Sequence, residues 1–353
     1  MFCLKFSLFH VSPENITIGY TLMWPSADPR FKCLRQGLHV PESTRLSTSL
    51  SRIRTWLEAC ERLHPICSPS GAFLPVRLLD LTCGDQSMTR LISTTHFDLE
   101  NRPASWYACL SHCWGETRSP HLTTKSNLQA NMEAIPIVDL LQTFQDSIEV
   151  CRALNISYLW IDTFCIIQDD LEDWQAHVVD MSSIYENAYL TLAAGASRDG
   201  SGGLFKTTVS RDYTAVKTIE LPNIGGEPYR VQVRRQIHHP DFLSLDGPED
   251  FPLMRRGWAF QEKLLSKRYL CFGDKEILWE CCEDVACSCS VTSGPFNPRL
   301  NNQAPAFLCS KVTHKFYSDL KHTFFYLIVL GQSILAIRKE LTECLHFPTM
   351  SVR

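Results

Sequence analysis

The chain has 353 residues, a formal net charge of −4 at pH 7, 44% hydrophobic residues and 20% charged residues. This is the balance of a globular protein with room for one large domain or two modest ones. It carries no basic run with interleaved aromatic residues, which excludes an electrostatic case for a nucleic-acid partner. The 16 cysteines are scattered, and several stand inside apolar runs, which favours buried reduced thiols in a cytoplasmic protein over a disulfide framework.

The first hundred residues predict a loosely ordered leader and then a helical lead-in. Residues 1–50 show weak periodicity and many turn formers, and their apolar start is too short for a signal peptide. Residues 51–67 place apolar side chains at helical spacing, and Pro65 should end that helix. A loop then leads to a strand-like run over 74–82. We therefore separate the leader from a lead-in over 51–105.

Residues 106–285 alternate short apolar runs with amphipathic segments. Three runs predict buried strands: 107–112, 158–162 and 189–194. An apolar stripe at helical spacing covers 139–154, and a second helix should begin after Asp170, where acidic residues suit a first turn. Strands joined by helices long enough to cross over are parallel, so the sequence predicts an α/β domain with a parallel sheet flanked by helices.

The rest of the predicted domain contains an insertion, a helix and a hairpin. Residues 206–250 read as an insertion with one strand over 229–233. A helix should cover 255–265, followed by a β-hairpin formed by 268–272 and 276–280.

One later segment is strongly apolar. Residues 323–337 fall short of the ~20 residues that span a bilayer. They also contain Gln332 and Ser333. We therefore expect a buried helix there and no membrane span.

A short cluster of metal-ligand residue types ends the lead-in helix. Cys60, His64 and Cys67 follow the pattern C-x3-H-x2-C. A structural zinc needs a fourth ligand. One of four later cysteines could provide it: Cys281, Cys282, Cys287 or Cys289. The alternative is a plain core pattern, because Cys60 and His64 share one helix face.

Several blocks of the chain resemble the heterokaryon incompatibility (HET) domain of filamentous fungi. These blocks are YACLSHCWG at 107–115, YLWIDTFCIIQDD at 158–170, the DW, MSSIYENA and LAA pieces of 173–194, RGWAFQE at 256–262 and LWEC at 278–281. Their order and spacing also agree, and the resemblance covers residues 56–285. It departs at His177, where Glu is expected, and at His112, where Tyr is usual. Residues 286–353 form a C-terminal extension that does not resemble the usual continuation of the family. A truncated sequence or an imperfect gene model would explain this difference.

The resemblance implies a cytoplasmic fungal protein that triggers cell death in self/non-self recognition. It implies an incompatibility partner protein and favours self-association. HET domains are also remotely similar to TIR domains, which implies a TIR-like or flavodoxin-like core. Some TIR domains cleave NAD at the nicotinamide–ribose bond, so NAD is a candidate substrate by fold analogy. The alternative is a non-enzymatic signalling module that acts by self-association or by sensing a nucleotide.

Polar residues end the first two predicted core strands, where α/β sheets gather ligand-facing groups. Ser111 ends the first strand, and Asp162 ends the second and is a candidate for binding a ribose hydroxyl. Trp114 could stack on a base or nicotinamide ring, and Gly115 would let the backbone approach a ligand. The alternatives are a helix cap at Asp162 and a tight turn with Trp114 in the core.

Glu262 is the candidate catalytic residue. It stands four residues after Trp258, so both lie on one helix face with Arg256 at the start of the same helix. A carboxylate beside a breaking glycosidic bond stabilises an oxocarbenium-like transition state and can orient water. Nicotinamide already leaves as a cationic group, so no strong general acid is needed. The alternative is that Glu262 pairs with Arg256 or Lys263 and only stabilises the helix.

A Ser/His/Asp hydrolase built from Ser111, His112 and Asp162 is disfavoured by geometry. Adjacent residues of a strand point to opposite faces, so His112 cannot easily serve Ser111. The chain also has no G-x-S-x-G motif.

Overall fold

The computed structural model describes part of the chain, and all of that part belongs to one of two compact units. The units are residues 1–304 and 305–353. The described residues are 8–11, 17–23, 40–68, 73–95, 107–115, 122–207, 215–221, 229–235, 237, 251–289 and 294–295. The predicted domain boundaries at 50/51, 105/106 and 285/286 stay predictions.

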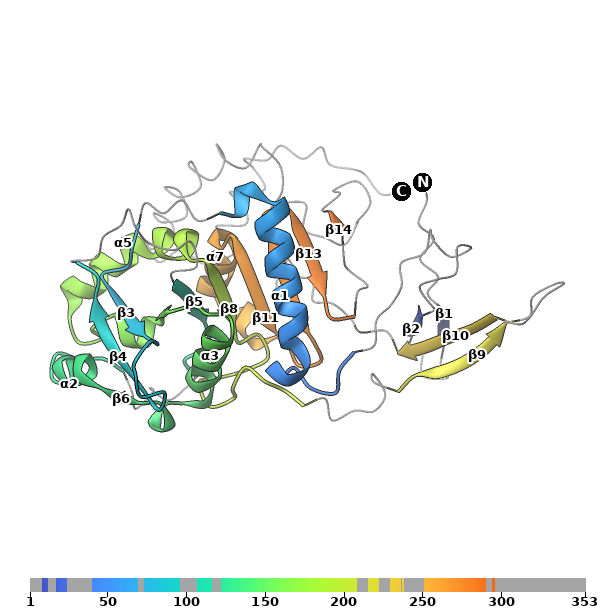
Figure 1. Cartoon of the computed structure of the whole chain (residues 1–353), viewed down its shortest axis with the longest axis horizontal. Coiled ribbons are helices and arrows are strands. Elements are labelled where there is room, and N and C mark those ends of the chain that lie inside the picture. Colours follow the sequence, from blue (N-terminus) through green and yellow to red (C-terminus); the bar gives the residue numbers. More distant parts are fainter. Residues whose placement is uncertain are drawn as a thin grey trace. The chain divides into compact units, whose positions relative to one another are not determined.

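The main sheet of the described residues has ten strands (Figure 1). In spatial order they are β14 (Gly294–Pro295), β13 (Asp284–Cys287), β12 (Ile277–Cys281), β11 (Arg268–Phe272), β8 (Leu190–Ala193), β5 (Tyr107–Ser111), β7 (Tyr158–Trp160), β3 (Arg77–Asp80), β4 (Met88–Ser93) and β6 (Ile135–Pro136). The three strands predicted for the core are β5, β7 and β8. They lie side by side in the middle of this sheet.

The centre of the sheet is parallel. β5 pairs with β7 on one side and with β8 on the other, and β8 pairs in parallel with β11. The outer pairs are antiparallel. Since the second and third of these parallel strands flank the first, the connections diverge at the carboxyl end of β5, as at the ligand-binding switch points of α/β sheets. The predicted α/β class with parallel strands flanked by helices is confirmed.

The predicted hairpin is also confirmed, and it extends the main sheet. β11 and β12 pair antiparallel, with Arg268 opposite Cys281. β11 pairs with β8 as well, through Leu270 beside Leu192. The hairpin therefore adds strands to the parallel core.

The helices lie close to their predicted places, with shifted ends. Their bounds are α1 (Leu46–Leu63), η2 (Pro65–Cys67), α2 (Leu128–Glu133), η3 (Ile137–Asp139), α3 (Gln142–Ala153), α4 (Asp162–Cys165), α5 (Leu171–Asn187), η4 (Pro252–Arg255) and α7 (Gly257–Leu265). Pro65 does end the lead-in helix, by starting the 3-10 turn η2. The predicted strand over 158–162 is shorter, because Asp162 begins α4.

Two helices leave some of their apolar side chains exposed. Leu171 and Trp174 of α5 are 68% and 45% exposed, and Leu63 of α1 is 59% exposed. The buried residues of α5 all lie between His177 and Tyr185, so the first turns of the helix extend beyond the core. Helical spacing finds the apolar face but not how far the neighbouring element covers it.

A second sheet of four antiparallel strands uses residues from the predicted leader and insertion. Its order is β1 (Leu8–Val11), β2 (Thr17–Met23), β10 (Tyr229–Arg235) and β9 (Lys217–Leu221). The strand predicted over 229–233 corresponds to β10. The predicted leader thus contains two strands, β1 and β2, and also the start of α1.

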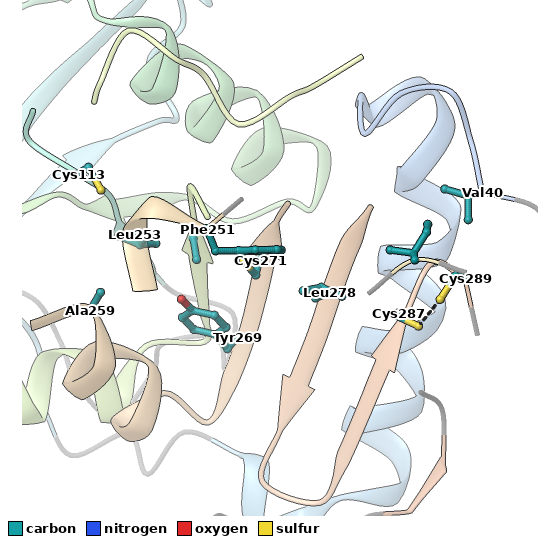
Figure 2. Packing of buried hydrophobic residues seen from close by; sticks show 12 residues of the cluster. Val40, Cys113, Phe251, Leu253, Ala259, Tyr269, Cys271, Leu278, Cys287 and Cys289 are labelled. Carbon is teal, nitrogen blue, oxygen red and sulfur yellow. Dashed lines mark hydrogen bonds between the residues drawn. The ribbon is translucent and has the colours of Figure 1, made fainter. Parts of the chain in front are cut away.

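A buried apolar cluster ties α7 to the hairpin strands (Figure 2). Ala259 of α7 and Leu253 of η4 are nearly fully buried in it, together with Tyr269 and Cys271 of β11. Burial of such apolar surface contributes about 25 cal/mol per Å². α7 therefore has a fixed position against β11, which matters because Glu262 lies on this helix.

No helix among the described residues is both long enough and apolar enough to cross a bilayer. The apolar segment 323–337, predicted as a buried helix, lies outside the described residues.

Candidate functional site

The end of β5 places a serine hydroxyl against a buried carboxylate of α7. All residues of β5 are buried, and Ser111 is its last residue. The Ser111 hydroxyl donates a hydrogen bond to Oε2 of Glu262. Glu262 is only 7% exposed. The two residues are 151 positions apart in the sequence, so the tertiary fold alone brings them together. They meet at the switch point of the parallel strands.

Burial changes the acidity of this carboxyl. Loss of solvent raises the pKa of Glu262 to about 7, and the nearby charge of Asp162 acts in the same direction. The Ser111 hydroxyl and the Arg256 guanidinium act the opposite way, because both favour the carboxylate. A carboxyl that exchanges its proton near neutral pH can serve as a general acid or base, and such groups cluster at functional sites.

A second carboxylate follows the neighbouring strand β7. Asp162 begins α4, and its Oδ1 accepts a hydrogen bond of 2.7 Å from the backbone N–H of Thr163. Its Oδ2 accepts the indole N–H of Trp114, also at 2.7 Å. Asp162 therefore accepts a backbone N–H from the first turn of α4, and it also binds Trp114 through the indole N–H. The Trp114 side chain is partly exposed.

His112 lies on the other side of the chain from Ser111. Its Nε2 is 3.4 Å from the Thr163 hydroxyl, and its Nδ1 is 3.8 Å from Oδ1 of Asp162. Its ring packs edge-on against Phe144 of α3, with centroids 5.2 Å apart. Burial lowers the pKa of His112, which favours the neutral ring. The strand geometry thus separates His112 from Ser111, as expected for adjacent residues.

The other candidate residues of the sequence are Arg256, Trp258 and Gly115. Arg256, the N-cap residue of α7, donates a hydrogen bond through Nη1 to the backbone carbonyl of His112. Trp258 is partly buried on α7. Gly115 has a φ of +81°, and a Cβ there would lie 2.7 Å from Cβ of Asp199. The glycine is therefore required by the turn and by this close approach of the protein's own chain.

The structure brings Ser111 and Glu262 together, joins Trp114 to Asp162 and adds two tyrosines. Burial raises the pKa of Tyr185, on α5, and of Tyr269, on β11, well above its usual range. The Tyr185 hydroxyl favours the carboxylate of Glu262, and Ser111 lowers the pKa of Tyr269. Neither tyrosine is among the candidate site residues of the sequence. Helical phase could indicate that Tyr185 faces inward, but only the strand order shows which carboxyl it reaches.

Lys263, which the sequence offered as an alternative partner of Glu262, forms an ion pair with a different residue. Nζ of Lys263 lies 2.6 Å from Oε2 of Glu280 on β12. This buried ion pair links α7 to the hairpin. The ion pair therefore attaches α7 to the sheet without using Glu262. The Ser111–Glu262 contact is not needed for this attachment and can have a chemical role.

Two groups of metal-ligand types occur in the described residues, both away from the switch point. One contains Cys60, His64, Cys67 and Cys281, whose ligand atoms all lie within 4.8 Å of one another. The other is formed by Glu276, Cys287 and Cys289, which are all buried. The structure thus joins the three residues predicted from the lead-in to one of the four later cysteines proposed as a fourth ligand.

Comparison with known proteins identifies the part of the chain that contains this site. Residues 107–262 match the family model described as "Heterokaryon incompatibility protein (HET)". The match begins with β5 and ends at Glu262, so it includes both sides of the Ser111–Glu262 contact. Comparison with curated proteins and with solved structures gives no match.

Proposed function

We propose that this chain, which carries a heterokaryon incompatibility (HET) domain over residues 107–262, takes part in heterokaryon incompatibility as a cytoplasmic effector of cell death that hydrolyses NAD. The family match supports the biological role. The observation that supports the chemistry is the buried Ser111–Glu262 contact at the switch point, beside Asp162. The bond to be cleaved is the one between nicotinamide and ribose.

The reaction needs a carboxylate more than an acid. As the bond from C1′ to the nicotinamide nitrogen breaks, its electron pair returns to the ring, and nicotinamide leaves as a neutral molecule. Positive charge develops on the ribose, and the Glu262 carboxylate would stabilise it. Water then adds to C1′ and loses a proton to this carboxylate or to solvent, which gives ADP-ribose. With a pKa of about 7, Glu262 is partly ionised at neutral pH and can accept that proton.

Other residues would position the substrate. Asp162 lies at the carboxyl end of the neighbouring strand, where α/β sheets gather ligand-binding groups, and it would bind a ribose hydroxyl. Its hydrogen bond to the Trp114 indole orients a partly exposed aromatic surface, on which nicotinamide or adenine could stack. Arg256 acts on Glu262 through its charge and binds the backbone carbonyl of His112, and it would offer a positive charge to the diphosphate.

The test is release of nicotinamide from NAD by the purified full chain, followed by chromatography. High protein concentration and a crowding agent favour any assembly that completes the site. Glu262→Gln should reduce the rate by about 100-fold or more, the usual effect of removing a catalytic acid–base or electrostatic group. Glu58→Gln, at an exposed position of α1, is the matched control and should keep full activity. If the Glu262→Gln protein is folded and releases nicotinamide as fast as the unchanged chain, the proposal is wrong.

A second candidate is a non-enzymatic module that signals by self-association. The observation that favours it is the exposure of three apolar side chains of α5, Leu171, Trp174 and Val179. Leu171 and Trp174 are three positions apart and so are neighbours on the helix surface, where a partner could cover both. In this case Leu171→Glu should reduce self-association measured by light scattering, and incompatibility would persist in the Glu262→Gln variant.

A further inference from the structure

Four ligand atoms from three elements converge at one side of the hairpin. Cys60 lies in the last turn of α1, His64 caps that helix and Cys67 ends η2. Cys281 ends β12. Their sulfur and ring-nitrogen atoms all lie within 4.8 Å of one another, and the three cysteines are buried while His64 is partly exposed. The three thiols are not joined in disulfides.

One pair of these atoms has the spacing of a tetrahedral site. With Zn–S of about 2.3 Å and Zn–N of about 2.0–2.1 Å, tetrahedral angles put sulfur and nitrogen ligands about 3.6 Å apart. Nδ1 of His64 lies 3.4 Å from Sγ of Cys281. Helical spacing places Cys60 and His64 on one face, and the turn at Pro65 brings Cys67 back towards them.

We propose that Cys60, His64, Cys67 and Cys281 bind one structural zinc ion. Three thiolates and one imidazole form a complete ligand set, with no position open for water or substrate, as in structural zinc sites. The site lies outside residues 107–262 and does not depend on the proposed NAD chemistry. Its role is to fasten the lead-in helix to the hairpin strand.

Surrounding groups are arranged as expected around zinc-bound thiolates. Nε of Arg268 donates to Sγ of Cys60 at 3.3 Å, and the backbone N–H of Asp284 donates to Sγ of Cys281 at 3.3 Å. Arg268 is only 2% exposed, so its charge needs a buried counter-charge. Three thiolates and one zinc ion carry a net charge of −1, which the guanidinium would balance. Hydrogen bonds of this kind to the ligands orient and tune metal sites.

The ion would hold together two segments that are far apart in the sequence. His64 and Cys281 are 217 positions apart, so the link closes a long loop around the whole family-matched region. Stacking of Trp56 on Trp279, with centroids 6.4 Å apart, makes a second contact between the same helix and strand. In Figure 1, α1 lies beside the strands of this end of the sheet. A β12 fastened in this way also supports β11, which packs against α7.

The first test is the metal content of the purified full chain. After dialysis against a weak chelator, elemental analysis should find about one zinc ion per chain, the stoichiometry of a single closed site. Refolding with Co²⁺ in place of zinc should give the intense visible absorption of a tetrahedral thiolate site. A chain that is folded, contains no zinc and does not give this spectrum would overturn the proposal.

Variants then identify the ligands. Cys281→Ser and His64→Ala should each lower the zinc content several-fold and lower the melting temperature, and His64→Ala is the milder change because that side chain is partly exposed. Cys282→Ser is the matched control, since it removes the adjacent thiol, and it should keep the zinc. Equal zinc content in the Cys281→Ser protein and the unchanged chain, or loss of zinc from Cys282→Ser alone, would refute this ligand set.

Discussion

The raised pKa of Glu262 makes a quantitative prediction about stability. The carboxyl goes from an ordinary pKa of 4.5 to about 7 on folding, because burial removes its solvent. At about 1.4 kcal/mol for each tenfold change in proton affinity, this corresponds to about 3 kcal/mol. A group whose pKa is raised by folding stabilises the protein fully below the pKa of the unfolded state. This contribution is lost as pH rises from about 4.5 through about 7.

Glu262→Gln removes the titration and keeps the shape of the side chain. We expect the variant to gain stability relative to the unchanged chain as pH rises, by roughly 2–3 kcal/mol between about pH 5 and about pH 8.5. The measurement is the free energy of unfolding in urea for both proteins at several pH values in this range. The difference should grow with pH and level off above about pH 8, where Glu262 is ionised in both states.

A flat difference over this range would refute the reasoning. It would mean that Glu262 is already ionised in the folded protein at about pH 5, held by Arg256 and the Ser111 hydroxyl. Ser111→Ala gives a second check. The Ser111 hydrogen bond favours the carboxylate, so its loss should raise the pKa of Glu262 further and make stability fall more steeply near pH 7. Glu58→Gln controls for removal of a formal charge at an exposed position.

Three further changes test the framework of the site by thermal and urea unfolding. Gly115→Ala should destabilise by about 1–3 kcal/mol, because the left-handed backbone is strained and the new Cβ meets Cβ of Asp199 at 2.7 Å. Unchanged stability would show that this turn relaxes freely. Asp146→Ala should cost at least about 2 kcal/mol, since its Oδ2 accepts two backbone N–H groups of the loop after β8, and Asp146→Asn should cost less. Lys263→Met should cost about 3 kcal/mol by leaving Glu280 unpaired, and Lys263→Met combined with Glu280→Leu should recover most of that loss; no recovery would mean that the lysine acts by packing alone.

Most helices and strands could be predicted from the sequence, but which strands pair and which elements pack together could not. Alternating apolar runs and helical stripes gave the three core strands and the helix between 139 and 154, because these periods reflect a local backbone geometry. The same spacing did not show that Leu171 and Trp174 are exposed, since exposure depends on where the neighbouring element ends. The predicted β11–β12 hairpin was found, but its pairing with β8 was not foreseen, because sequence patterns do not report which edge of a sheet a strand joins.

The candidate zinc ligands show the same division. Cys60, His64 and Cys67 were predicted together because one helix and the turn after it bring them close. Four later cysteines were equally good choices for the fourth ligand. Only the antiparallel register of β11 and β12, with Cys281 opposite Arg268, places one of them against that turn.

The order of residues along the chain was enough to determine the α/β class, the family resemblance and the polar residues at the ends of two strands. These properties depend on neighbours a few positions apart, where backbone geometry and side-chain type act directly. The meeting of Ser111 with Glu262, and the burial that raises the pKa of this carboxyl, were decided by the tertiary structure alone. Desolvation and long-range contact depend on everything that packs around a side chain, and no local pattern contains that information.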